Sequence, residues 1–439
     1  MLSSHKFLFF IFFILFSCAD DQPFLHNIVR RASDAILIPC DPYELNATHS
    51  CLVFASSYSR KLVVYDATAE AWVLAPNGFF PLPIRVGPGT HRLAKVLSAN
   101  DKFPFFLALD QAIPALFAVQ AFPDKDKKRR GFFTPQEQKL DKSLRPYQIA
   151  AWQGESHVFV LLSYRDDKSI GILALDPLTG VLDPQIQPIK IPVGQRPSQI
   201  VIDADRKFAL ISDEESGILH KLDLSNIKDI LKNPSLAVFS PSINIGTPAD
   251  KIYLQKRDFG EGLKSYVVAF KTGKKELRLI NIDDNKISST KALDAYPQAA
   301  YFPDEKSEPC CEKSNKSADN RHWIAVADIK GRMTYYLFKY LNNNLSLEAD
   351  AAQEFDLLSE KNFALSQLQL TSIIGGQVLD DPSLKRKLSC PNNRKMFFIA
   401  SFGTDRPRTW TYSEAVEVEA QGWTCEGNLE SSRFGHKQE

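Results

Sequence analysis

The stretch that decides the fold is VGQRPSQIVIDADRKFALISDEESGILHKLDL, from Val193 to Leu224. It opens with a Gly-x-x-Pro turn, and three short apolar runs rich in β-branched residues follow, at 200–202, 208–211 and 218–224. Polar turns separate these runs, and Pro and Gly occur only in the turns. This pattern predicts a meander of three antiparallel strands.

The unit recurs along the chain. Turn prolines stand at Pro146, Pro197, Pro248 and Pro297, which are 51, 51 and 49 residues apart. A period near 50 with one meander per repeat is typical of β-propeller blades. We therefore predict an all-β protein, a single β-propeller of seven blades, each a four-stranded antiparallel sheet. Six or eight blades are the alternatives, because residues 341–390 are less regular.

The Gly-x-x-Pro turn, the apolar run that ends at Asp203 and the segment KFALISD at 207–213 resemble the YVTN-type (YncE-like) propeller repeat. The resemblance extends from Ile36 to Tyr412 and implies the fold without a single function, since propellers host many activities. We place the propeller at 35–414 and interpret 415–439 as a closing strand or a disulfide-linked cap. Ile36–Pro39 is the candidate strand that pairs with the C-terminal part to close the ring.

The N-terminus has the pattern of an export signal. Lys6 precedes Phe7 to Phe16, an unbroken apolar run of ten residues that is too short for a permanent span. Leu15-Phe16-Ser17-Cys18 resembles the bacterial lipobox, which implies a signal peptide at 1–18, membrane attachment by lipid on Cys18 and a tether at 19–34. We expect the chain in the bacterial envelope, at the outer membrane. The alternative is an ordinary secretory signal cleaved near Ala19.

Six cysteines remain after Cys18, an even number that in an exported chain indicates disulfides. Cys40 and Cys51 flank a short polar loop and form the first predicted pair. Cys310 and Cys311 are adjacent, so we expect one to bond Cys390 and the other Cys425, with the order open. The sequence contains no Cys-x-x-Cys motif and no Cys/His cluster, so we predict no metal site.

The charge and the motifs argue against several function classes. The 439 residues carry a formal net charge of +1, which does not predict a nucleic-acid partner. The eight histidines are scattered singly, and no Gly-x-Ser-x-Gly elbow or phosphate-binding glycine loop occurs. Only His91 follows a turn that could face a central channel. We therefore predict no cofactor.

One set of residues has a geometric argument for binding. Equivalent positions of successive blades form a ring around a propeller axis, and the residue before the inner strand is Arg92, Arg145 or Arg196 in three neighbouring blades. Three arginines would supply bidentate donors for carboxylate or phosphate groups at the channel mouth. The alternative is that Arg-Pro caps the blade turn. The other candidates for this face are Gln148, Gln199, Tyr58, Tyr164 and Arg165.

These observations favour a non-enzymatic scaffold that binds an envelope protein or an anionic glycan through the arginine-bearing face. The first alternative is a propeller enzyme of lactonase or oxidoreductase type, because a lactonase site needs only a few channel residues. The second is a secreted eukaryotic protein, since Asn46, Asn315 and Asn344 begin glycosylation sequons. A search for bound cofactor and a lactone screen separate the scaffold from the enzyme.

Overall fold

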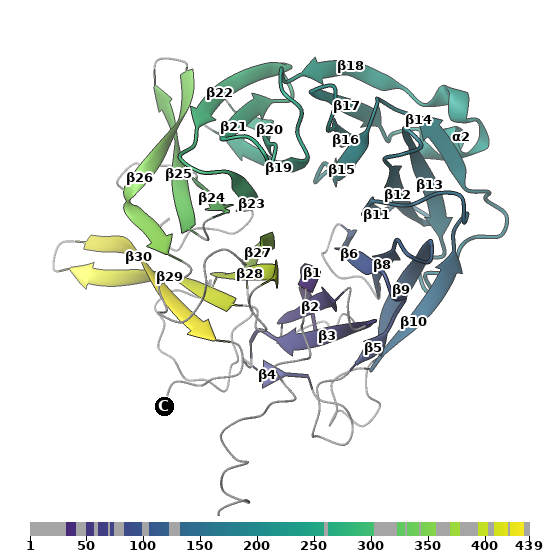
Figure 1. Ribbon diagram of the computed structural model, residues 1–439, viewed down its shortest axis with the longest axis horizontal. Coiled ribbons are helices and arrows are strands. Elements are labelled where there is room, and N and C mark those ends of the chain that lie inside the picture. Colours follow the sequence, from purple (N-terminus) through teal and green to yellow (C-terminus); the bar gives the residue numbers. More distant parts are fainter. Residues whose placement is uncertain are drawn as a thin grey trace, which may run out of the picture.

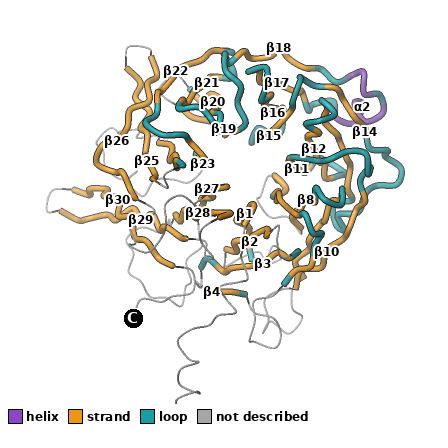
Figure 2. The backbone as a smooth tube through the Cα atoms, in the orientation of Figure 1, coloured by secondary structure: helices purple, strands orange, loops and turns teal. Residues whose placement is uncertain are grey.

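Seven sheets, antiparallel except for one parallel pair of strands, stand around a central axis in the computed structural model of the chain (Figure 1). The described residues are 32–40, 50–56, 60–68, 71–73, 83–98, 105–122, 132–258, 262–302, 323–329, 332–341, 344–356, 369–377, 394–402, 408–419 and 422–433. Within them the tube view shows strands joined by turns, with helix confined to the rim (Figure 2). The architecture is that of a β-propeller, and the predicted all-β fold is confirmed.

Blades one to three come from the N-terminal half. Blade one contains β1 Ala32–Pro39, β2 Ser50–Ser56, β3 Lys61–Asp66, β4 Ala71–Trp72 and β5 Ile84–Arg85. Blade two contains β6 Thr90–Ala94, β8 Phe105–Asp110, β9 Ala115–Phe122 and β10 Phe132–Lys139. Blade three contains β11 Gln148–Gln153, β12 Val158–Tyr164, β13 Ser169–Leu175 and β14 Ile189–Pro192, and it adds the parallel strand β7 Val96–Leu97.

Blades four to seven each have four strands in chain order. Blade four contains β15 Pro197–Ile202, β16 Phe208–Asp213, β17 Ile218–Asp223 and β18 Phe239–Asn244, with helix α2 Ile227–Lys232 and the 3-10 turn η2 Pro234–Leu236 before β18. Blade five contains β19 Lys251–Asp258, β20 Leu263–Phe270, β21 Glu276–Asn281 and β22 Lys286–Ala292. Blade six contains β23 Pro297–Tyr301, β24 Trp323–Asp328, β25 Arg332–Leu341 and β26 Asn344–Asp356. Blade seven contains β27 Gln369–Gln377, β28 Arg394–Phe402, β29 Arg408–Glu419 and β30 Gly422–Arg433.

The core consists of apolar layers between neighbouring blades. One layer joins Leu107 and Leu116 of blade two to Val160 of blade three, and others join blades one and two, three and four, four and five, and five and six. Because a middle strand has a blade on each side, both of its faces are buried, and all seven residues of β12 are buried. The sequence of such a strand is therefore an apolar run instead of an alternating pattern.

One aspartate explains the repeated turn before the inner strand. Asp213 ends β16, and its Oδ2 accepts a hydrogen bond from Gln195 N at 2.6 Å while its Oδ1 accepts from Glu215 N at 2.9 Å and Ser216 N at 3.0 Å. Gly194 has φ +60°, and a Cβ there would lie 2.4 Å from Asp213 Oδ2, so both the backbone and the space require glycine. Asp110 binds the turn of blade two in the same way.

The ring closes differently from the prediction. β1 pairs only with β2, and the sheet of blade seven is built from β27 to β30 alone. β1 lies beside β27 and β28, so blade one packs against blade seven without a shared strand. The expected pairing of Ile36–Pro39 with the C-terminal part is therefore wrong. Part of 415–439 is instead the outer strand β30 of blade seven, and β1 begins within the predicted tether 19–34.

The structure tests one of the predicted disulfides. Cys40 and Cys51 are bonded, which confirms the pair, and the bond lies in blade one beside the antiparallel strands β1 and β2. Cys18, Cys310, Cys311 and Cys390 lie outside the described residues, and the backbone of Cys425 lies in β30 opposite Val416. Among the described residues, no helix has the length and apolar character needed to cross a membrane.

Candidate functional site

Five inner strands present one residue each at the same register toward the channel. The residue lies opposite the end of the second strand of its blade: Asp34 faces Ala55, Arg92 faces Leu109, Gln148 faces Ser163 and Lys251 faces Phe270. Gln199 holds this position in blade four, where its N–H donates to Ser212 Oγ at 3.0 Å. All five side chains are half-buried, although the strands around them are tightly packed. We call Asp34, Arg92, Gln148, Gln199 and Lys251 the channel ring.

Two members of the channel ring connect successive blades. Asp34 Oδ2 accepts a hydrogen bond from Leu93 N at 2.9 Å, and Gln199 Oε1 accepts one from Ile252 N at 2.9 Å. Each acceptor therefore binds the N–H of the residue that follows the ring residue of the next blade. An inner strand has a hydrogen-bonded neighbour on one edge only, so the other edge would otherwise leave buried N–H groups unpaired.

The channel ring also concentrates charge. Burial raises the pKa of the Asp34 carboxyl, although Arg92 and two backbone donors oppose the shift. Burial, followed by the positive charge of Arg92, lowers the pKa of Lys251 from 10.5 to about 8. Beside them, burial and then Arg92 lower the pKa of His91 to about 4, and burial raises the pKa of Tyr253 to about 12. The channel therefore favours the neutral forms of its own titratable groups.

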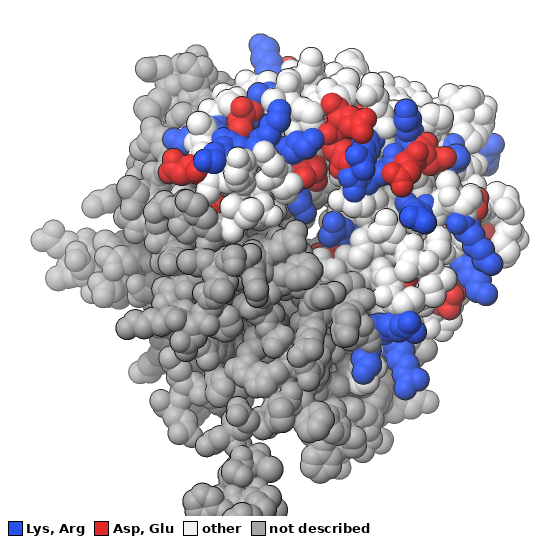
Figure 3. Space-filling model, in the orientation of Figure 1, with Lys and Arg blue, Asp and Glu red and all other residues white. Residues whose placement is uncertain are grey.

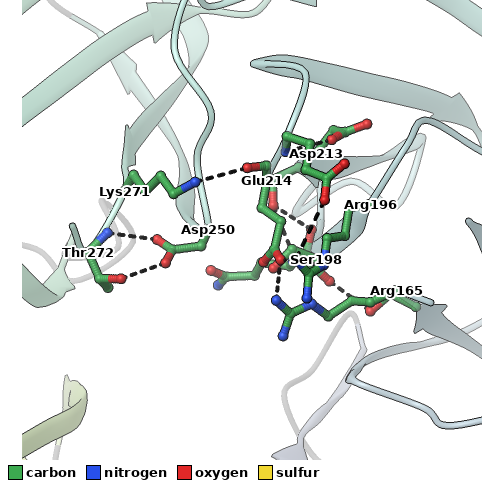
Figure 4. Close-up of polar contacts among 12 residues, drawn as sticks. Arg165, Arg196, Ser198, Asp213, Glu214, Asp250, Lys271 and Thr272 are labelled. Carbon is green, nitrogen blue, oxygen red and sulfur yellow. Dashed lines mark hydrogen bonds and ion pairs between the residues drawn. The ribbon is translucent and has the colours of Figure 1, made fainter. Parts of the chain in front are cut away.

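A second group of polar residues lies at the mouth of the channel, in the turns of blades three and four (Figure 4). Glu214 points between two arginines: its Oε1 accepts from Arg196 Nε at 2.8 Å and from Arg165 Nη2. The guanidinium of Arg165 also lies over the Tyr147 ring, 4.1 Å from its centroid. Glu214 keeps only 9% side-chain exposure, whereas Arg196 keeps 40%. We call Tyr147, Arg165, Arg196 and Glu214 the mouth cluster.

Backbone contacts fix the mouth cluster in place. Glu214 N donates to Arg196 O at 3.1 Å, and Glu214 O accepts from Lys271 Nζ of blade five at 3.2 Å. Beneath the arginines, Ser163 Oγ donates to Ser198 O at 2.7 Å and so joins blade three to blade four. The cluster therefore presents guanidinium groups whose positions are set before any partner arrives.

The structure revises how the predicted residues group together. Arg92 is not equivalent to Arg145 and Arg196, because it lies within β6 at the register of Gln148 and Gln199 and belongs to the channel ring. The guanidinium carbon of Arg92 lies 5.6 Å from the centroid of the Tyr147 ring. Tyr147 therefore lies between the channel ring and the mouth cluster. Arg145 is exposed and makes no ion pair with another described residue. The predicted row of three equivalent arginines is therefore wrong.

Tyr164 is a second correction. Its side chain is only 4% exposed and packs in the apolar layer between blades two and three, so it does not lie on the binding face. A Cβ on Gly171 would lie 2.7 Å from the Tyr164 ring, which shows how closely the neighbouring strand covers it. Arg165, the next residue, does reach the mouth. Tyr58 lies outside the described residues.

Sequence reasoning missed Tyr147, Asp34 and Lys251, and it placed Glu214 on a loop of the binding face without predicting its contact with the arginines. The missed signal is the glycine of the blade turn. In VGPGTHR, VGQRPSQ and IGTPADK, the residue five places after glycine is Arg92, Gln199 and Lys251, respectively. Alignment on proline moves blade five out of step by one residue, because Pro248 follows Gly246 by two places whereas Pro197 follows Gly194 by three.

A chain of three polar side chains lies at another turn of blade three. His157 Nδ1 forms a hydrogen bond with Ser156 Oγ at 2.8 Å, and His157 Nε2 forms one with Asp183 Oδ2 at 2.7 Å. Ser156 is exposed on the loop between β11 and β12, where Gly154 N donates to His157 O at 2.8 Å and no backbone donors of the described residues converge on the serine. Both ring nitrogens of His157 therefore have a hydrogen-bond partner. Within the described part of the chain no three Asp, Glu, His or Cys residues form a metal site.

Positive and negative side chains are interleaved over the described part of the face in Figure 3. The surface seen there has no extended field of one sign, which agrees with the net charge of +1. Recognition at this face therefore depends on locally placed groups, and the mouth cluster and the channel ring are two such groups.

No protein-family model matches the chain, and no curated protein matches its sequence. Several solved structures are similar to it in shape. Hsv2 of Kluyveromyces marxianus is 11% identical with a TM-score of 0.49, over 91% of this chain and 98% of that one. The dihydro-heme d1 dehydrogenase NirN in complex with DHE is 11% identical with a TM-score of 0.49, over 92% and 69%. BBS1N, solved in complex with ARL6DN, is 11% identical with a TM-score of 0.43, over 67% and 76%.

Proposed function

We propose that the protein is a non-enzymatic recognition scaffold that binds an acidic partner, an envelope protein or an anionic glycan, at the channel mouth between blades three and four. The observation that supports this proposal is the fixed orientation of Arg165 and Arg196 by the single carboxylate of Glu214. Arginine and tyrosine side chains held in place are favoured at binding hot spots, because little conformational entropy is lost on association.

The charge of this region suits an anionic partner. Among the described residues, the carboxylates paired with Arg165 and Arg196 are Glu214 and the more exposed Glu215, whose Oε1 lies 3.5 Å from Arg196 Nη1. Arg145 has no ion pair among the described residues and is exposed, so it is available to a carboxylate or a sulfate of the partner.

The cellular setting is part of the same proposal. Lipid attachment at Cys18 would anchor the scaffold to the bacterial envelope, at the outer membrane, with the propeller exposed to its partner. Replacement of Cys18 by Ser should release the chain from the membrane fraction into the soluble fraction. Mass spectrometry of the N-terminal peptide distinguishes this anchor from an ordinary signal cleaved near Ala19.

A cross-linking pull-down from envelope extract tests the binding face. The bait is the wild-type chain against the double variant Arg145→Glu and Arg196→Glu, with Lys228→Glu and Lys232→Glu on α2 as a control of equal charge change. A partner captured by the wild type and the control, but lost by the variant with Arg145→Glu and Arg196→Glu, supports the proposal. Equal capture by all three contradicts it. The enzymatic alternative has its own test, a lactone-hydrolysis screen on the same purified chain.

A further inference from the structure

Two cations of the channel ring, Arg92 and Lys251, form no ion pair with any residue that the structure describes. Lys251 Nζ makes no hydrogen bond and no ion pair with any described residue, although its side chain is half-buried. Among the described residues, the guanidinium of Arg92 has a cation–π contact with the Tyr147 ring. The Nε of Arg92 is buried without a hydrogen-bond acceptor. Buried polar groups in native proteins are almost always paired, so an unpaired pair of cations in one channel requires an explanation.

The structural role of the channel ring does not explain them. Asp34 and Gln199 each use an oxygen to accept a hydrogen bond from the otherwise unpaired N–H of the next inner strand. Arginine and lysine carry donors only and cannot perform that task. The corresponding N–H in blade three is that of Ile149, and Arg92 of blade two has no acceptor to offer it. Ile149 N donates instead to Gln148 Oε1 of its own blade, at 3.3 Å. The two cations therefore serve something other than the closure of the strand edge.

Two carboxylates act on Lys251, Asp250 and Asp34, and neither forms an ion pair with it. Both Asp250 oxygens accept hydrogen bonds from Thr272. Asp34 Oδ1 accepts from Ala35 N at 3.0 Å and Oδ2 from Leu93 N at 2.9 Å, so each of its oxygens already has a donor. It interacts electrostatically with Arg92 and with Lys251 but lies within ion-pair distance of neither. The two cations come from blades two and five, and both act on the same carboxyl, so they face a common part of the channel.

We propose that this part of the channel binds a compact oxyanion with two negative charges, of the sulfate or phosphate class, between Arg92 and Lys251. The anion offers acceptors on all sides to side chains that carry donors only, and its charge matches that of the two cations. The site lies on rigid inner strands and not on loops. It does not depend on the binding of a macromolecule at the mouth, so the two proposals can fail separately.

Titration calorimetry with sodium sulfate on the full chain tests the site directly. We expect one sulfate per chain, and no heat from sodium chloride at the same ionic strength. Arg92→Gln and Lys251→Gln should each weaken sulfate binding about ten- to a hundredfold, the usual effect of losing a hydrogen bond to a charged group. Lys232→Gln, which changes an exposed lysine of α2 outside the channel and the mouth cluster, should bind like the wild type. Absence of sulfate binding, or equal binding by all four chains, overturns the proposal.

Thermal unfolding separates this role from a structural role of the lysine. Without sulfate, Lys251→Met should have a Tm equal to or above that of the wild type, because the change removes an unpaired cation from the channel. With sulfate, the Tm of the wild type should rise and that of the variant should not. A variant that is less stable without sulfate would show that Lys251 supports the fold and would overturn the proposal. Parallel titrations with inorganic phosphate and glycerol 1-phosphate distinguish a free anion from a phosphate ester.

Discussion

Gln199 Oε1 accepts a hydrogen bond from the backbone N–H of Ile252 at 2.9 Å and so joins the inner strands of blades four and five. The contact lies on the channel side of the propeller, where the inner edge of β19 has no neighbouring strand in its sheet. A side chain that was a candidate for ligand binding thus stabilises the propeller itself.

The first prediction concerns this contact. Gln199→Leu removes the acceptor and leaves Ile252 N unpaired, which should lower the free energy of unfolding by about 1–3 kcal/mol. Gln199→Glu keeps an acceptor oxygen and should retain most of the wild-type stability. Urea unfolding followed by tryptophan fluorescence measures both. Gln195→Leu, at an exposed position in the same turn, is the control, and a loss of equal size there would contradict the assignment.

The second prediction concerns Asp213. Burial opposes ionisation of its carboxyl, but backbone donors from Gln195, Ser216 and Glu215 outweigh burial and lower the pKa to about 2. A depressed folded-state pKa gives stability that is complete above the unfolded value near 4 and is lost as the pH falls through about 2. Asp213→Asn should therefore cost about 2 kcal/mol or more at pH 7, and the difference from wild type should shrink in acid. Denaturant titrations at pH 7 and in acid measure the difference in the free energy of unfolding, with Asp166→Asn, at an exposed position, as the control.

The third prediction concerns the mouth cluster. Glu214→Gln removes the charge that holds Arg165 and Arg196 together, so the turn between β16 and β17 should become more mobile. Hydrogen exchange should show faster exchange for the amides of 214–217 in this variant. Glu215→Gln, whose side chain is 51% exposed, should leave these rates unchanged. Unchanged exchange in Glu214→Gln would mean that the backbone contacts alone order the turn.

The fourth prediction concerns the disulfide. Cys40 and Cys51 are 11 residues apart, and a bond across a loop of this length contributes about 3 kcal/mol through restriction of the unfolded chain. Cys40→Ser with Cys51→Ser should lower the Tm under oxidising conditions. Added reductant should lower the Tm of the wild type toward that of the double variant. A double variant with the Tm of the oxidised wild type would contradict the prediction.

The fifth prediction concerns the pH dependence of sulfate binding. The groups that face Lys251 are Asp34 of β1, Arg92 of β6, and Asp250 and Tyr253 beside it, and the lysine titrates at a pKa of about 8. Deprotonation removes one of the two cations, so sulfate affinity should fall as the pH rises through that pKa. Sulfate keeps its charge over this range, so calorimetry from pH 6.5 to 9.5 reports on the protein. A flat profile would mean that Lys251 does not contact the anion.

The fold could be predicted because each blade repeats the same local chemistry. Apolar strands between turns at a fixed period identified the blades that follow Pro146, Pro197, Pro248 and Pro297. The less regular region after residue 341 supplies β27 and β28 of blade seven. Strand closure could not be predicted in this way, since no periodicity records which edges meet. β1 is complete within blade one, and packing against β27 replaces pairing.

The site was predicted less well, for a geometric reason. A shift of three residues separates the mouth from the channel, as from Arg196 to Gln199, and turn prolines do not hold a constant register. Arg92 changed groups for this reason, and Lys251 was missed. Tyr164 was misplaced because a strand end with a polar neighbour looks the same in sequence whether or not the adjacent blade covers it.

Apart from β7, each blade is built from one continuous stretch of chain, and no strand is exchanged between the first blade and the last. During synthesis a blade can therefore form its sheet as soon as its outer strand emerges, with the preceding blade as its template. The Cys40–Cys51 bond links positions within the first of these units and needs nothing that follows. Assembly ends with a single docking event, in which the last blade meets β1 and the growing arc becomes a circle.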